Sequence, residues 1–247
     1  MSAGALAVIV AAMAIGAVAK GFTGTGLPTI AIPVMAGFLG VERAVVIMAI
    51  PTVVTNTWLL WEHRRHAGGT RDLPVMVLCG VVGVSAGVWA LISLDPRVLS
   101  LTLAAVIAAY VLTFALRPDL RLPARVTRYL SPPVGLAGGA LAGATGMAGP
   151  LIATYVHGFR LEPGAYVFAI TLQFQVFALV QVAGLAAVGL YTPARVWESI
   201  IALVPIVLAM PAGMWLARRV EPRRFELAVL AMLVLMGVKL AVDGLSA

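Results

Sequence analysis

The chain is dominated by uninterrupted apolar runs as long as a membrane-spanning helix. Two of the clearest are Val75 to Leu94 and Val98 to Leu116. A transmembrane helix needs about 20 consecutive apolar residues, and a membrane β-strand shows an alternating pattern that these runs lack. Hydrophobic residues make up 62% of the 247-residue chain and charged residues only 11%, well below the share of about 25% in soluble domains. The sequence therefore predicts an all-α, polytopic integral membrane protein.

Two glycine-rich strips interrupt the apolar runs and indicate an internal repeat. The first strip is GFTGTGLP at residues 21–28, and the second is GATGMAGP at residues 143–150. Glycine, threonine, glycine and proline recur in the two strips at the same spacing. Further along, Glu42 corresponds to Glu162, and each stands just before the next apolar run. We therefore expect two copies of one transmembrane unit.

The repeat divides the chain into three parts, which are a first transmembrane repeat at 1–117, a cytoplasmic linker at 118–129 and a second transmembrane repeat at 130–247. The apolar runs fall at 3–19, 27–39, 43–61, 73–93 and 97–116, and then at 130–142, 150–160, 164–190, 195–217 and 225–243. The second run of each half, and the run at 130–142, are too short to cross a bilayer. These pieces are predicted to be half-helices, re-entrant elements or broken spans.

The arginines orient the bundle, because loops rich in Lys and Arg stay in the cytoplasm. Arginines are frequent at 62–72, at 117–128 and at 218–224, whereas the corresponding loops at 95–97 and 191–195 carry one each. The arginine-rich loops therefore lie at different places in the two halves. This pattern predicts an inverted-topology repeat, as in many secondary transporters, with both termini outside the cytoplasm. It also accounts for the net charge of +7 without nucleic acid as a partner.

The two strips are the predicted substrate site, since irregular backbone at membrane depth is tolerated only where it is buried or lines a watery cavity. Pro28 and Pro150 suit the first turn of a following half-helix. The N-terminus of such a helix carries free N–H donors and a partial positive charge, and so favours an anion. The predicted substrate-binding residues are Lys20, Gly21, Thr23, Gly24, Thr25, Gly26, Asn56, Thr145, Gly146, Gly149, Gln173 and Gln175.

Each polar position also has a plainer interpretation. Lys20 could extend to a membrane surface instead of facing a cavity, and buried amides often connect helices. His157 is a candidate for proton coupling, with an interfacial hydrogen bond as the alternative. Glycines also let helices approach closely, and Gly135, Gly139 and Gly143 recur every four residues. Lys239 and Asp243 stand one helical turn apart and are expected to pair or to reach the interface.

Motifs for other chemistry fail on their context. Gly83 to Gly87 fits G-x-S-x-G, but the pattern lies inside a continuous apolar run without acid or histidine partners. Cys79 is the only cysteine, and no phosphate-binding loop or metal-ligand spacing occurs. We therefore expect no catalytic residue, no cofactor and no metal.

The repeated strips, together with the Arg- and Pro-containing loop before the last helix of each half, resemble the TauE/SafE sulfite exporter family. The resemblance covers nearly the whole chain. It implies a multi-pass carrier in the bacterial inner membrane that moves sulfite, sulfonates or other organic anions, often outward, with 21–28 and 143–150 lining the site. The strips depart from the family's glycine run at Thr25, Leu27, Met147 and Ala148.

The predicted function is secondary transport of a small anion by alternating access, with the site between the repeats. An anion channel is the main alternative. An intramembrane enzyme such as a lipid phosphatase would need acids and arginines clustered at depth, and a cation carrier would need carboxylates in its path. The expected partners are the anion and the lipid bilayer. The sequence leaves open a homodimer, the identity of the anion, the direction of transport and the coupling ion.

Overall fold

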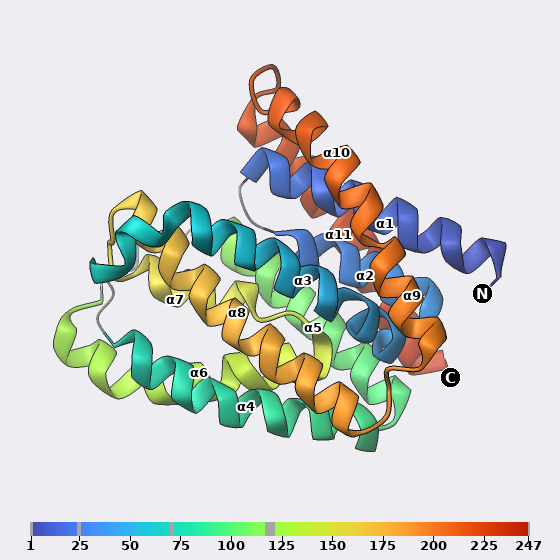
Figure 1. Ribbon diagram of the computed structural model, residues 1–247, viewed down its shortest axis with the longest axis horizontal. Helices are drawn as coiled ribbons and strands as arrows, with labels where there is room; N and C mark the ends of the chain where they lie inside the picture. Colours follow the sequence, from blue (N-terminus) through green and yellow to red (C-terminus); the bar gives the residue numbers. More distant parts are fainter. Residues whose placement is uncertain (1, 24–25, 70–71, 117–121, 247) are drawn as a thin grey trace.

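The computed structural model describes residues 2–23, 26–69, 72–116 and 122–246, and these ranges contain helices and short turns but no strand (Figure 1). The helices are α1 Ala3–Thr23, α2 Leu27–Leu39, α3 Val41–His63, α4 Leu73–Ser93, α5 Pro96–Leu116, α6 Ala124–Thr145, α7 Gly149–His157, α8 Pro163–Ala187, α9 Pro193–Ile201, α10 Leu203–Leu216 and α11 Pro222–Ser246, with a 3₁₀ turn, η1, at Arg64–Gly69. The predicted all-α fold class is confirmed.

Seven helical stretches in the described ranges are long and apolar enough to cross a membrane. They are Ala3–Phe22, Val41–Ala67, Leu73–Ser93, Pro96–Leu116, Pro163–Ala187, Pro193–Leu216 and Arg223–Ser246. Many large apolar side chains on their outer faces are exposed, among them Leu208, Leu235 and Leu245. An exposed apolar surface of this kind suits contact with lipid rather than with water. The molecule is therefore a polytopic membrane protein.

The short second runs are α2, with 13 residues, and α7, with 9 residues, and neither is long enough to span. The run at 130–142 is part of a longer helix, the 22-residue α6, which is not among the seven stretches, so its character as a broken span stays a prediction. The helix begins at Ala124, in a polar stretch that a search for apolar runs passes over. Its first turns are held by Thr127, whose hydroxyl donates to Asp72 Oδ2 at 2.6 Å and whose carbonyl accepts from Tyr155 Oη at 3.1 Å.

The predicted run at 195–217 is divided into α9 and α10 at Ala202. Pro205 explains the division. Proline has no N–H to donate to the carbonyl four residues before it, and its ring crowds that carbonyl. Here that carbonyl belongs to Ile201, the last residue of α9.

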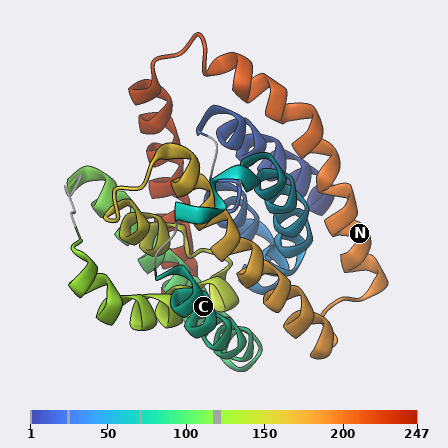
Figure 2. The same ribbon diagram turned by 60° about the vertical axis from the view of Figure 1, so that its left-hand side comes forward.

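The tightest helix contacts lie between α4 and α6, which run side by side in Figures 1 and 2. The backbone of Gly139 lies against the carbonyl of Gly80, and the backbone of Gly143 lies against the carbonyl of Val84. There is no room for a side-chain carbon at either glycine. The four-residue glycine ladder is therefore a packing surface, as in other membrane helix pairs.

The same surface explains the G-x-S-x-G pattern in α4. Gly83 and Gly87 lie against the carbonyls of Leu136 and Ala140 in α6. Ser85 stands between them in an unbroken helix, and its hydroxyl donates to the carbonyl of Val81 at 3.0 Å. The pattern therefore serves helix packing in this chain.

A second contact of the same kind joins α1 to α10. Gly21 lies against the carbonyl of Met210, and Gly213 lies against the carbonyl of Val18. These contacts are the counterparts of those between α6 and α4, at constant offsets of 122 residues (21 to 143 and 18 to 140) and of 126 residues (84 to 210 and 87 to 213). The first helix of each predicted repeat therefore packs against the fourth apolar run of the other predicted repeat.

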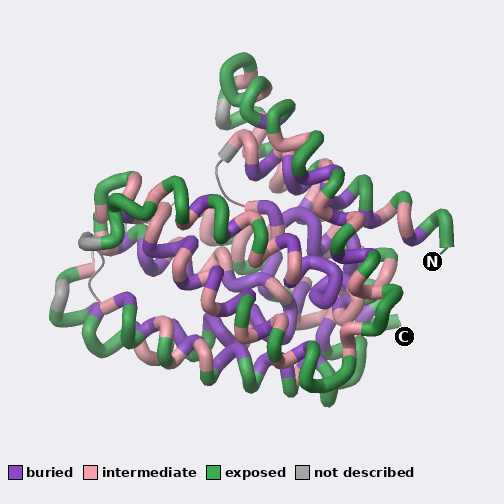
Figure 3. The backbone as a smooth tube through the Cα atoms, in the orientation of Figure 1, coloured by how far each residue is buried: buried purple, intermediate pink, exposed green. Residues whose placement is uncertain are grey.

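Buried residues are concentrated in the middle of the bundle, where α2, α3, α7 and α8 meet, and exposed residues are most frequent along the helices at its edge (Figure 3). On the outside of the bundle, Lys239 Nζ donates to Asp243 Oδ2 at 2.5 Å, so the predicted pair forms within α11. Lys239 thus belongs to the surface.

We expect Gly139→Ala to destabilise the protein by about 2 kcal/mol, because the added carbon would overlap the Gly80 carbonyl and force α4 away from α6. Gly4→Ala is the matched control, since a side-chain carbon at Gly4 meets nothing within 4 Å. The measurement is thermal unfolding of both variants in the same detergent. Equal melting temperatures would show that the α4–α6 contact does not need glycine.

Candidate functional site

The two strips form breaks between helices. The first break separates α1 from α2, and Gly26 precedes α2 with φ of 100°. The second break follows α6, where Gly146 has φ of 69°. Both values lie in the left-handed region that favours glycine. Pro28 and Pro150 stand in the first turns of α2 and α7, as the sequence predicts.

The two breaks lie next to each other. A side-chain carbon on Gly146 would meet Ile32 of α2, and one on Gly149 would lie 3.5 Å from Thr29 Oγ1. The end of α6 and the start of α7 therefore lie against the first turns of α2. This contact joins two segments that are more than 100 residues apart in the sequence.

A cavity of about 170 Å³ lies beside both breaks. Gly26 to Thr29 border it from the first break, and Gly146 to Gly149 border it from the second. The remaining walls come mainly from α3 and α8. Its polar lining side chains are Lys20, Thr29, Thr52, Asn56, Tyr110, Thr171 and Gln181. The described lining residues include no Asp or Glu.

Lys20 is the cation of this cavity. It lies in the last turn of α1, and only 4% of the residue is exposed. No hydrogen bond or ion pair joins its ammonium group to another described residue. A buried charge is costly unless it is paired. An anion in the cavity would provide the charged partner that no described residue provides.

Asn56, on α3, offers a second unused donor. The residue is 8% exposed and lines the cavity, and its Nδ2 has no hydrogen-bond partner among the described residues. Gln181, on α8, differs because its Nε2 donates to the carbonyls of Ala142 at 2.6 Å and Gly143 at 3.3 Å. The amide of Gln181 thus satisfies backbone acceptors at the end of α6, while the amide of Asn56 remains available.

Five of the predicted substrate-binding residues line this cavity, namely Lys20, Gly26, Asn56, Gly146 and Gly149. Gly24 and Thr25 lie outside the described residues, as does the side chain of Thr23. Gly21 packs against α10 instead of the cavity.

The other predicted residues are engaged elsewhere. The hydroxyl of Thr145 donates to the Leu141 carbonyl at 2.8 Å within α6. Gln173 Nε2 donates to the carbonyl of Met76 at 3.2 Å, and Gln175 Nε2 donates to Thr57 Oγ1 at 3.0 Å. These three side chains are not among the cavity lining.

His157 is exposed at the end of α7, where its ring meets the ring of Tyr166 edge-on at 6.1 Å. It does not line the cavity, and its role in proton coupling stays a prediction. No group of three or more His, Cys, Asp or Glu that could hold a metal occurs in the described ranges.

The walls also contain residues that the sequence does not single out as site residues, among them Thr52 and Phe174. On α3, the lining residues Ala49, Thr52 and Asn56 recur at helical spacing. On α8, the lining residues Thr171 and Phe174 are likewise three residues apart. This spacing places the side chains on one helix face, but the α3 series begins at the apolar Ala49 and so gives no clear signal in the sequence.

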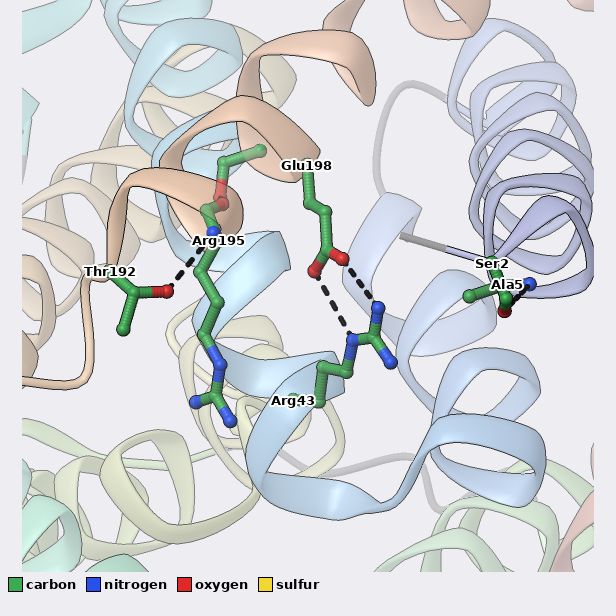
Figure 4. Close-up of polar contacts among 7 residues, drawn as sticks. Ser2, Ala5, Arg43, Thr192, Arg195 and Glu198 are labelled. Carbon is green, nitrogen blue, oxygen red and sulfur yellow. Dashed lines mark hydrogen bonds and ion pairs between the residues drawn. The ribbon is translucent and has the colours of Figure 1, made fainter.

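Charged side chains join α3 to α9 near the break between α2 and α3 (Figure 4). Arg43 donates to both carboxylate oxygens of Glu198, with Nε 3.2 Å from Oε2, and Glu198 is only 3% exposed. Arg195 donates to Glu42 Oε1 at 2.7 Å beside it. The partners are more than 150 residues apart, so the sequence alone does not reveal these pairs.

Comparison with known proteins gives one family. The family described as Sulfite exporter TauE/SafE matches residues 8–240, which is nearly the whole chain. No curated protein and no solved structure matches the chain.

We expect Glu198→Gln to lower the stability by about 2–3 kcal/mol, because it leaves the Arg43 guanidinium without its charged partner. Glu221→Gln is the matched control, since the Glu221–Arg224 pair is exposed and contributes little. Unfolding in detergent provides the measurement. The double variant Arg43→Gln with Glu198→Gln should lose less than Glu198→Gln alone, and equal stability of Glu198→Gln and Glu221→Gln would contradict this account.

Proposed function

The chain belongs to the TauE/SafE sulfite exporter family, and from this premise we propose that it is a secondary transporter of a small anion. The substrate is sulfite, an organosulfonate or a related organic anion. The observation that carries the proposal is the buried Lys20, which has no partner among the described residues and lies with Asn56 in a cavity bordered by both helix breaks. A membrane protein with such a cavity is suited to bind one anion at a time.

The electrostatics of the cavity favour an anion over a cation. The N-terminal turns of α2 and α7 border it, and a helix N-terminus presents free N–H donors and a partial positive charge. Lys20 adds a full positive charge, and Asn56 Nδ2 adds a neutral donor. A cation would require carboxylates, and the described lining has none.

The proposed mechanism is alternating access between two inverted halves. The reciprocal contacts of α1 with α10 and of α6 with α4 support this view, because each half then moves with one helix of the other. The arginine-rich loops at 62–72 and 218–224 lie in the cytoplasm in this arrangement. The chain is then a protein of the bacterial inner membrane, with both termini on the outside.

The ion pairs between α3 and α9 fit the same mechanism as an outer gate. They join the start of α3 to α9, which follows the arginine-poor loop assigned to the outside. When the pairs form, the outer ends of α3 and α9 stay together, and the site is closed on that side. Breaking them opens the site outward. An anion then leaves with the help of an inside-negative potential, by about 2.3 kcal/mol per charge per 100 mV.

A channel would use the same cavity chemistry, and the kinetics of transport separate it from a carrier. A carrier shows saturation and counterflow in liposomes, because its site faces one side at a time. A channel shows neither. The intramembrane-enzyme alternative would need acids and arginines at the cavity, and the described lining contains neither.

We expect Lys20→Ala to weaken anion binding at least tenfold, because a charge-assisted hydrogen bond in a buried site contributes about 1.5–3 kcal/mol. Lys239→Ala is the matched control, since Lys239 pairs with Asp243 on the outside of the bundle. The measurements are sulfite and methanesulfonate binding to purified protein, and counterflow in liposomes. Equal losses in the two variants would remove Lys20 from the site.

A further inference from the structure

The cavity is lined by the same positions of the two halves. Five residues of α3 and five of α8 are related by the 122-residue offset and all line it, and the pairs are Met48 with Ile170, Ala49 with Thr171, Thr52 with Phe174, Asn56 with Ala178 and Leu59 with Gln181. Lys20 and Ala142 form a further pair at the helix breaks. The cavity therefore lies where the equivalent helices of the two halves face each other.

The paired positions differ in chemistry. Lys20 and Asn56 belong to the first half, and their counterparts are both alanine, at 142 and 178. Thr52 has Phe174 as its counterpart. At these three pairs of positions the first half carries a polar side chain and the second half an apolar one.

Two polar residues of the second half do not cancel this asymmetry. The Gln181 amide nitrogen is held by the carbonyls of Ala142 and Gly143. Thr171 adds a neutral hydroxyl and no charge. The charged donor and the unpartnered amide donor, the Lys20 ammonium and Asn56 Nδ2, both come from the first half.

The opposite wall is formed by aromatic and small apolar side chains of α8. Phe174, Phe177 and Ala178 all line the cavity. Apolar surface of this kind gains free energy by contact with an apolar group, about 0.8 kcal/mol for each methylene buried, or about fourfold in affinity. A bare oxyanion leaves this wall without a partner.

The charge of the cavity lining limits the charge of the ligand. Lys20 is the one charged side chain in the described lining. A second negative charge on the ligand would face only the partial charges of the helix N-termini and no matching cation, which is unfavourable in a buried site. The site therefore balances one negative charge.

Building on the proposed function, we infer that the site binds a monovalent organic anion with a small apolar group. The acidic head group accepts hydrogen bonds from Lys20 and Asn56, and the apolar group packs against Phe174 and Phe177. The cavity volume of about 170 Å³ limits that group to a few carbon atoms. Sulfate, with two charges and no apolar part, fits poorly.

The experiment measures binding of sulfate, methanesulfonate, ethanesulfonate and propane-1-sulfonate to the purified, unmodified protein. The three sulfonates share one charge and differ only in apolar length. We expect affinity to rise by about fourfold per methylene, and methanesulfonate to bind at least tenfold more tightly than sulfate. This series decides the inference without any variant.

Phe174→Thr then tests the apolar wall, because it places on α8 the residue found at the equivalent position of α3. We expect the preference for propane-1-sulfonate over methanesulfonate to fall from about 15-fold to less than threefold. Phe168→Thr is the matched control on the same helix, away from the cavity lining, and should keep the preference.

The outcomes separate this inference from the proposed function. If sulfate and all three sulfonates bind equally, with binding still lost in Lys20→Ala, the anion site stands and the apolar wall is irrelevant to it. If none of the four anions binds, or if Lys20→Ala binds as well as the unmodified protein, the proposed anion site falls together with the inference. A preference that increases with chain length and disappears in Phe174→Thr supports both.

Discussion

In lipid, every backbone N–H and C=O group needs a hydrogen-bond partner within the protein. This requirement determines much of the structure. A helix that stops inside a membrane protein leaves carbonyls and N–H groups that water cannot satisfy. At the end of α6, Gly146 N donates to the Ala142 carbonyl at 2.8 Å, and Gln181 from α8 donates to the carbonyls of Ala142 and Gly143. The first turns of α2 and α7 border the cavity, and the first N–H groups of a helix have no partner within it. The proposed anion site would complete the hydrogen bonding at these two helix ends.

The glycine contacts hold these interruptions in place. Because α4 approaches α6, and α10 approaches α1, backbone to backbone, each interrupted helix is attached along its length to a long neighbour from the other half. Close packing without flexible side chains leaves little freedom for sliding. The interrupted ends near Gly26 and Gly146 can then be positioned by the whole bundle and not by their own short sequences.

Local chemistry explains which parts of this arrangement can be predicted from the sequence. Glycine and proline determine where α2 and α7 begin, and the repeat indicates that the two breaks belong together. The start of α6 is missed because residues 124–129 are polar although helical.

Asn56 and Gln173 show how far the site can be predicted from the sequence. Both are amides inside apolar helices, yet Asn56 faces the cavity while Gln173 contacts Met76. Helices α3 and α8 are apolar on nearly all sides, so no amphipathic face reveals their rotation. The Arg43–Glu198 pair depends on tertiary contact alone.

In the proposed alternating-access cycle, the contrast between Lys20 and Ala142 affects the relative energies of the two forms. In a carrier made of two identical halves in opposite orientation, a two-fold axis in the membrane plane would relate the inward-open form to the outward-open form, and the two forms would have equal energy in the absence of voltage. One ammonium group carried by a single half removes that degeneracy, since the charge is displaced relative to the bilayer when the halves exchange roles. The empty protein then has a preferred resting form, and the membrane voltage sets how strongly it is preferred.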